Sequence, residues 1–505
     1  MAETLYEAFA ATASRMPERT VVFCGEEEAT YRRILQEAEA IASALVREFQ
    51  VGPGDRVAIW MPNSVTFVSA LFGIWQAGGI AVPINSFYKP AEAGYVLSNS
   101  ESKVLISSKE TFGERVAATT AMLTPSPAVF WVQELPNIVS QSIEGYRAVQ
   151  SEQPAALIYT SGTTGRPKGA MLSHGNLLAN VESCRSALRL QEDDRFGLVL
   201  PMFHSFMLTV GLLLPLLSGV PTVILRSLSP LRNAMEELHR RGVSVLPVMP
   251  QFFAAMAHAP VPKTHRLRCC ISGSAPLPIR ILQDFEAAYG VPLLEGYGLS
   301  EASPVVSVNP INGVRKVGSI GLPIPGVEVT IRDDAGKILP PYQVGELWVR
   351  GPNVMLGYWK NEEATAKALR EGWLLTGDLG YLDEEGYIYI TDRKKDLILV
   401  RGNNVYPREI EEWIYQFPGV KDAAVIGEPD PSRGEHPVAF IEPADPQNPP
   451  DLQALASFLR ERLADYKLPR RYEIIPQLPR NATGKILKTV LREQTRPSSR
   501  ESLRG

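Results

Sequence analysis

Residues 57–84 read VAIWMPNSVTFVSALFGIWQAGGIAVPI. The apolar run Val57–Met61 predicts a buried strand, and Asn63 then predicts a helix cap. An apolar helix is expected over Val65–Ala77, closed by two glycines, and a second strand over Ile80–Ile84. A strand, a helix and a strand in so few residues predict a parallel β-α-β unit.

The same order recurs further along the chain. A strand, a helix and a strand are expected at 196–200, 209–217 and 222–225, and a helix, strand, helix and strand at 230–241, 244–248, 251–257 and 267–272. We therefore predict an α/β fold whose large N-terminal domain contains mainly parallel sheets.

The pattern changes after residue 318. Alternating strands at Val327–Arg332 and Gly345–Val349 predict a β-rich layer. Strands and helices after Asp392 predict a compact α+β domain of about 110 residues, a size that can hold its own core. The charged run Thr391–Asp396 between them suits a solvated hinge. The predicted division is 1–392 for the N-terminal domain, 393–395 for the hinge, 396–493 for the C-terminal domain and 494–505 for a disordered tail.

Bulk composition narrows the class of protein. A net charge of -4 gives no basic field for a nucleic acid. The 4 cysteines are too few for a disulfide framework, and the acidic N-terminus is unlike a secretory signal, so a reducing, cytoplasmic setting is expected. Two stretches without charged residues, 57–88 and 196–225, are broken by prolines and glycines, which argues against a transmembrane span. No feature reveals the oligomeric state, and a homodimer stays open.

A loop at residues 158–169, with the sequence IYTSGTTGRPKG, follows an apolar strand. Its hydroxyls, glycines and lysine together suit the oxygens of a polyphosphate. It is not the P-loop of kinases and GTPases, because Pro167 stands where that motif has glycine and Gly169 where it has serine or threonine. The alternative is a hairpin turn without a ligand.

The segment through His174 resembles the phosphate loop of the adenylate-forming superfamily, which includes acyl-CoA synthetases, luciferases and peptide-synthetase adenylation domains. Further segments match in the superfamily's order: SGSAP at 272–276 with EGYGLSE at 295–301, WLLTGD at 373–378, DRKKD at 392–396 and PRNATGK at 479–485. Ordered motifs over nearly the whole chain are far more specific than one motif. Ser300 replaces the commoner threonine and keeps a hydroxyl. Residues 272–274 and 403–404 depart from the usual pattern, so adenine fit and thiol entry are expected to differ in detail.

The resemblance implies an enzyme that uses ATP to convert a carboxylic acid to acyl-AMP and then transfers the acyl group to CoA, releasing AMP and pyrophosphate. It implies catalytic roles for Lys485, His204 and Glu301. It also implies ATP-binding roles for Thr160, Ser161, Gly162, Thr163, Thr164, Gly165, Lys168, Gly273, Ser274, Ala275, Pro276, Glu295, Gly296, Tyr297, Gly298, Ser300, Asp378, Arg393 and Lys485.

Several of these residues also have a chemical reason. A carboxylate must attack an α-phosphate that already carries negative oxygens, so cations must gather on the transition state. We expect Lys485 to supply one cation and a Mg²⁺ ion, held by Glu301 and Thr160, to supply another, because Mg²⁺ prefers oxygen ligands and shares them with phosphates. The alternatives are a surface lysine and a surface acid.

The nucleoside half of ATP has its own candidates. Asp378 can accept hydrogen bonds from both ribose hydroxyls, Tyr297 offers a flat ring to adenine, and Arg393 would reach ribose or phosphate oxygens. The alternatives are a turn aspartate, a core tyrosine and a charge in a solvated hinge.

In the superfamily, the histidine at the position of His204 flanks the acyl carboxylate and gates the acyl pocket, which we expect to include His204, Phe206, Val248 and Gly298. A buried structural histidine is the alternative. The surrounding apolar residues are Phe203, Met207, Leu208, Val210, Leu212–Leu214, Met249 and Phe252. They favour a medium- or long-chain fatty acid, although they would also suit a core; an aryl acid comes second.

The resemblance further implies that the C-terminal domain is mobile. It would rotate about Lys395, so that Lys485 faces the substrate during adenylation and leaves for the thioester step. Gly402 would then line the pantetheine channel, where a side chain would block passage. The rival functions are a luciferase-like monooxygenase, an adenylation enzyme that loads a carrier protein, and a non-catalytic nucleotide-binding protein.

Overall fold

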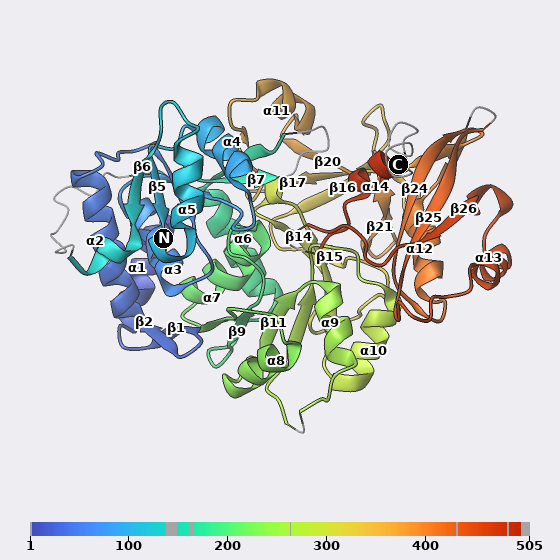
Figure 1. Cartoon of the computed structure of the whole chain (residues 1–505), viewed down its shortest axis with the longest axis horizontal. Helices are drawn as coiled ribbons and strands as arrows, with labels where there is room; N and C mark the ends of the chain where they lie inside the picture. The colour runs from blue at the N-terminus through green and yellow to red at the C-terminus, as the bar shows by residue number, and fades with distance from the viewer. Residues whose placement is uncertain are drawn as a thin grey trace.

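The computed structural model describes residues 3–137, 149–160, 166–262, 264–430, 433–481 and 484–495. These residues form a mixed α/β fold with a large N-terminal part and a smaller C-terminal part, which lies at one end of the long axis (Figure 1). Every helix in the described ranges is too short or too polar to span a bilayer. The cysteines are free and buried.

A seven-stranded sheet contains the expected β-α-β unit. Its order is β18 (Gly357–Tyr358), β8 (Lys168–Ser173), β7 (Pro154–Thr160), β4 (Ile80–Pro83), β3 (Arg56–Trp60), β5 (Val104–Ser107) and β6 (Ala128–Trp131). β3 and β4 are parallel neighbours, joined by α3 (Val65–Gln76). Val57 and Ile59 enter the main core, whereas Ala58 and Trp60 face a second core on the other side, because successive strand residues point to opposite faces.

The helix cap differs from the prediction. Ser64 caps α3, and its Oγ accepts a hydrogen bond from the Phe67 N–H at 3.1 Å. Asn63 instead donates to the Leu200 carbonyl at 3.0 Å and accepts from the Met202 N–H at 2.8 Å. Serine and asparagine are about equally good caps, so only the distant partners of Asn63 decide between them.

A nine-stranded sheet forms the second layer. Its order is β15 (Leu322–Pro323), β14 (Val305–Val308), β13 (Leu293–Gly298), β12 (Cys269–Ser272), β11 (Val245–Val248), β9 (Phe196–Leu198), β10 (Thr222–Ile224), β1 (Thr20–Cys24) and β2 (Glu27–Thr30). In this sheet, the neighbouring strands from β13 through β12, β11, β9 and β10 to β1 pair in parallel.

Helices surround both sheets. They are α1 (Leu5–Arg15), α2 (Tyr31–Arg47), α4 (Pro90–Ser100), α5 (Lys109–Thr120), α6 (His174–Ala187), α8 (Leu231–Arg240), α9 (Pro250–Ala257), α10 (Ile279–Tyr289) and α11 (Glu362–Ala368), with short 3-10 turns η1 (Val132–Asn137) and η3 (Ser300–Ala302); a further 3-10 turn, η4 (Asp465–Lys467), lies in the C-terminal part. The helix expected at 209–217 is split. A π-helical segment, η2 (Met207–Leu213), precedes α7 (Leu214–Leu217), where Pro215 cannot donate a helical hydrogen bond.

The expected β-rich layer is an antiparallel sheet of β16 (Glu328–Arg332), β17 (Gly345–Arg350), β20 (Trp373–Leu382), β19 (Leu369–Arg370) and β21 (Ile388–Arg393). The C-terminal part has another sheet, with β22 (Ile398–Val400), β23 (Asn403–Val405), β24 (Val420–Asp430), β25 (Gly434–Pro443) and β26 (Arg471–Ile474). α12 (Pro407–Tyr415) and α13 (Leu452–Arg460) pack on one face and α14 (Lys488–Thr495) on the other.

Two expectations at the ends of this C-terminal part need correction. The run Thr391–Asp396 is not uniformly solvated, because Asp392 and Asp396 are buried. Asp396 forms a 2.7 Å ion pair with Arg492. α14 continues through Thr495, beyond Gln494, where the disordered tail was expected to begin. Residues 496–505 lie outside the described ranges.

Candidate active site

A cavity of about 1550 Å³ lies where the large sheets, the antiparallel layer and the C-terminal part meet. Most of the predicted site residues line it, although they come from segments far apart in the chain. They are Thr160, Lys168, His204, Phe206, Gly273, Ser274, Ala275, Pro276, Glu295, Gly296, Tyr297, Gly298, Ser300, Glu301, Asp378, Arg393, Lys395 and Lys485. The carboxyl ends of parallel strands meet at one edge of a sheet, which is where α/β proteins bind ligands.

The base of the predicted phosphate loop is a β-hairpin. Thr160 ends β7 and pairs with Lys168, which begins β8, so the geometry of the hairpin alternative is present. Both residues line the cavity, which a hairpin turn without a ligand does not require. Ser161, Gly162, Thr163, Thr164 and Gly165 lie outside the described residues.

The segment that follows β12 allows other groups to come close to its backbone. A Cβ atom on Gly273 would lie 3.0 Å from the ring of Phe206, so any larger residue would press that ring by a few tenths of an ångström. Ser274 adopts φ 70, a left-handed conformation that is uncommon for serine. Its Oγ is buried and has no hydrogen-bond partner among the described residues. A strained backbone and an unsatisfied hydroxyl at a cavity wall fit a polar ligand such as a nucleotide.

The predicted ribose residue is held by neighbours on its own strand β20, on the paired strand β21 and on β13 of the nine-stranded sheet. Asp378 is 3% exposed; the Tyr297 hydroxyl donates to its Oδ2, and the Nε of Arg393 lies 3.0 Å from its Oδ1. The Asp378 N–H donates to the Thr376 hydroxyl at 3.0 Å. Asp378 raises the pKa of Arg393, and burial together with Asp378 raises the pKa of Tyr297. Arg393 therefore lines the cavity and is ion-paired with Asp378, although it stands at the start of the predicted hinge and its side chain is 38% exposed.

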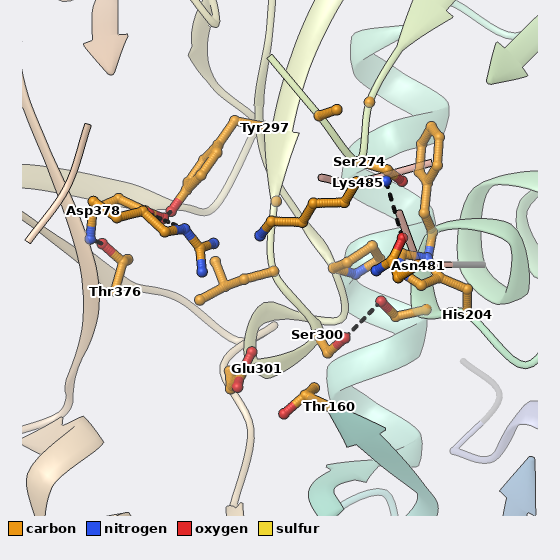
Figure 2. Close-up of a pocket in the computed structure, with 18 of the residues that line it drawn as sticks. Thr160, His204, Ser274, Tyr297, Ser300, Glu301, Thr376, Asp378, Asn481 and Lys485 are labelled. Atoms are coloured by element: carbon orange, nitrogen blue, oxygen red, sulfur yellow. Dashed lines mark hydrogen bonds and ion pairs between the residues drawn. The ribbon is translucent and has the colours of Figure 1, made fainter. Parts of the chain in front are cut away.

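Glu301 lies beside oxygen-bearing side chains. The Tyr358 hydroxyl donates to Glu301 Oε1 at 2.7 Å, and in Figure 2 Glu301, Thr160 and Ser300 lie on one side of the cavity. In the described part of the chain, no group of three or more His, Cys, Asp or Glu residues could hold a metal by itself. A carboxylate with a nearby hydroxyl fits Mg²⁺, which commonly takes its remaining ligands from phosphates and water.

His204 is neutral near pH 7. Burial, followed by the nearby Lys485 ammonium, lowers its pKa to about 4. Its Nδ1 faces the Phe206 N–H at 3.3 Å, so Nδ1 is the acceptor and Nε2 carries the proton. The neighbouring Ser205 hydroxyl lies 2.9 Å from that of Ser300. Because His204 is neutral and its Nε2 carries the proton, it can donate one hydrogen bond into the cavity without adding a charge there.

Lys485 enters the cavity from the C-terminal part. Figure 2 shows its side chain between Asp378 and His204. A tight turn holds it: the Lys485 N–H donates to Asn481 Oδ1 at 2.9 Å, and Gly484 adopts φ 84, which favours glycine. Burial, assisted by the nearby cations of Arg393 and Lys395, lowers the pKa of Lys485 to about 8. The ammonium is still mainly protonated at pH 7.

The acyl pocket differs in part from the prediction. Val248 is fully buried and does not line the cavity; its carbonyl accepts the Gly273 N–H at 3.2 Å. Met207, Leu208, Leu212–Leu214 and Phe252 are also core residues. Apolar residues that do line the cavity, together called its apolar arm, include Phe203, Phe206 and Val210 with Cys184, Leu188 and Ile324; the last three were not predicted. Cys184 and Leu188 share one helix face, but many core helices have this spacing.

The two residues expected to act in the thioester step lie differently. Lys395 lines the cavity, and burial lowers its pKa. Gly402 is exposed, adopts φ 81 and does not line the cavity in this arrangement. Gly298, expected in both the nucleotide and acyl sites, does line it. A Cβ on Gly298 would lie 2.2 Å from the Pro304 carbonyl oxygen, so the pairing of β13 with β14 requires glycine.

Comparisons with known proteins agree with this geometry. The AMP-binding enzyme family model matches residues 9–359, and the AMP-binding enzyme C-terminal domain model matches residues 409–485. A long-chain-fatty-acid--CoA ligase of Bacillus subtilis is 35% identical, with 97% of this chain and 94% of that protein covered. A feruloyl-CoA synthase of Amycolatopsis is 36% identical, with 95% and 97% covered. The crystal structure of ATP-bound MatB from Rhodopseudomonas palustris superposes with a TM-score of 0.90 at 31% identity and covers 98% of this chain and 100% of that one. The resemblance seen in the sequence is thereby confirmed: the chain belongs to the AMP-binding enzyme family and is an acyl-CoA ligase.

Proposed function

We propose that the protein activates a medium- or long-chain fatty acid as its acyl-adenylate and transfers the acyl group to CoA, with Mg²⁺ as the metal. The observation that carries this proposal is the entry of Lys485, a cation from the C-terminal part, into a cavity lined by the nucleotide motifs. The apolar arm beside His204 and the fatty-acid ligase among the relatives support the choice of acid. Each buried methylene contributes about 0.8 kcal/mol.

The first step joins two anions. A carboxylate oxygen of the acid attacks the α-phosphorus of ATP, an O–P bond forms, and the bond to pyrophosphate breaks. Lys485 would offset the charge that develops on the phosphate oxygens, and the Nε2–H of His204 would orient the acid carboxylate. Glu301 and Thr160 would hold Mg²⁺, which neutralises phosphate charge when bound.

Other residues would place the nucleotide. Asp378 would accept the ribose hydroxyls, with Arg393 beside it, and Tyr297 would lie against adenine. Ser274 would satisfy its buried hydroxyl on the ligand. Thr160 and Lys168 would bring the phosphate loop to the polyphosphate.

The second step needs a different access route. The thiolate sulfur of CoA attacks the acyl carbonyl, a C–S bond forms, the C–O bond breaks, and AMP leaves. We place the hinge at residues 393–395; rotation about it would remove Lys485 and bring Gly402 to the thiol channel. Lys395→Pro should slow thioester formation from supplied acyl-AMP about tenfold or more and largely spare adenylation, because proline fixes φ. Single-turnover assays of both steps test the hinge, and the reverse pattern would place it elsewhere.

The decisive experiment is a pyrophosphate-release screen across fatty, aryl and amino acids, with and without CoA. A fatty acid should give release, and CoA should convert the product to acyl-CoA with AMP. Preference for an aryl acid would overturn the choice of substrate, and oxygen uptake would indicate a monooxygenase. Turnover only with a loaded carrier protein would show that the carrier protein, not CoA, is the acceptor. No release with any acid would refute the function. The free thiols support a cytoplasmic site for the reaction.

A further inference from the structure

Arg408 links the C-terminal part to the nucleotide side of the cavity. It lies at the start of α12, and its Nη2 is 3.5 Å from Oε1 of Glu295 on β13. Glu295 is only 3% exposed, and the same Oε1 also accepts a hydrogen bond from the Leu277 N–H at 3.1 Å. Arg408 therefore brings a cation to a buried carboxylate whose charged form would otherwise be costly.

A second contact comes from the next turn of the same helix. Glu412 Oε1 accepts the Ile279 N–H at 3.1 Å, at the first residue of α10. The first N–H groups of a helix lack helical partners and favour a negative charge. Residues four apart on a helix share a face, so Arg408 and Glu412 both point toward the N-terminal part.

Arg408 also contacts the strand that leads into the hinge. Its N–H donates to Asp392 Oδ2 at 2.9 Å, and its Nη1 donates to the Ile390 carbonyl at 3.1 Å. One residue thus holds both the last strand before the hinge and a carboxylate on the nucleotide segment. Within the C-terminal part, α12 packs on the apolar core through Ile410 and Ile414, and Arg408 and Glu412 are not members of that core.

We propose that Arg408 and Glu412 form an interdomain latch that holds Lys485 in the cavity for adenylation. The inference rests on the proposed function, since it assigns the latch to the first of two domain arrangements. Rotation about residues 393–395 would carry both side chains away from Glu295 and Ile279 and leave Glu295 without its cation. The latch positions Lys485 and sets the fraction of molecules ready for the first step.

The test compares the two half-reactions in Arg408→Met, Glu412→Ala and the double variant. We expect the double variant to slow acid-dependent pyrophosphate exchange about tenfold through kcat, with the KM for the acid unchanged, because the competent arrangement is less populated. Thioester formation from supplied acyl-AMP should be unchanged or faster. Small-angle scattering should show a more open average shape, and Glu412→Gln, which keeps an acceptor for the Ile279 N–H, should recover most of the exchange rate.

Lys467→Met is the matched control. This variant removes the 2.7 Å ion pair between Lys467 and Glu409. Glu409 lies on α12, like Arg408 and Glu412, but its partner is within the C-terminal part. The ratio of the two rates should therefore stay unchanged. Equal loss of both half-reactions, or no loss of exchange in Glu412→Ala with a normal thermal unfolding curve, would overturn the latch. Wild-type enzyme without exchange would refute the proposed function instead.

Discussion

The two sides of the cavity are built in opposite ways. On the N-terminal side, site residues extend from paired strands, and the backbones are so close that Gly298 tolerates no Cβ. On the C-terminal side, the Lys485 N–H donates to Asn481 Oδ1, and the Asn481 N–H donates to the Lys485 carbonyl. The turn touches the N-terminal part through Gly484, where a Cβ would lie 3.5 Å from Met249. The comparison suggests a fixed binding surface and a catalytic cation that can be withdrawn.

The largest expected effect comes from removing that cation. Lys485→Ala should reduce pyrophosphate exchange about 100- to 1000-fold, the usual loss for one transition-state donor, and largely spare thioester formation from supplied acyl-AMP. Single-turnover assays of both steps would measure it. Lys421→Ala, an exposed lysine of the same part, is the control. Equal loss in both steps would show that the two sides of the cavity do not act separately.

A change on the fixed side should affect both steps together. Gly298→Ala places a Cβ against the Pro304 carbonyl, so β14 must shift, at a cost of about 1–3 kcal/mol in the free energy of unfolding. Denaturant unfolding and both half-reactions would measure the change. Gly94→Ala in α4, where the nearest atom would lie 3.7 Å away, should be neutral or stabilising. A stable variant that loses only one step would contradict the rigid-surface interpretation.

The pH profile should separate the two sides further. With a Lys485 pKa of about 8, kcat/KM for ATP should be level below pH 8 and fall up to about tenfold per pH unit above it, because the ammonium loses its proton. His204, with a pKa of about 4, should stay neutral across this range. Pyrophosphate exchange from pH 6 to 10 measures the profile. Lys485→Arg should remove the alkaline fall, and persistence of that fall would assign it to another group.

The smallest effect is expected in the apolar arm. Cys184→Phe should fill part of it and shift the preferred acid to a shorter chain, with a change of a few-fold in kcat/KM per methylene lost. A chain-length series of saturated acids would show the shift. The control is Cys270→Ser, at a buried core position that does not itself line the cavity, and it should leave the preference unchanged. An unchanged preference in Cys184→Phe would place the acid elsewhere.

Prediction from sequence worked best where short-range pattern was enough. The β-α-β unit at residues 57–84 and most strands and helices occur within a few residues of their expected positions, because apolar runs and repeats involve only residues close together in the chain. Prediction failed where two neighbouring residues were equally good helix caps, as with Asn63 and Ser64. It also missed Tyr358, which reaches Glu301 only because β18 pairs with β8. Ser205 and Thr376 were also missed, although each stands within two residues of a predicted site residue, His204 and Asp378 respectively.

The chain's own sequence determined the family, the order of the motifs and the identity of the charged groups, since these depend on residue type and spacing alone. Tertiary structure decided which apolar residues face the cavity and which are core: Val210 lines it and Val248 does not. It also decided that Arg393 pairs with Asp378 and that Arg408 reaches Glu295. These contacts join residues far apart in the chain, and long-range packing, which local periodicity does not encode, determines which of them form.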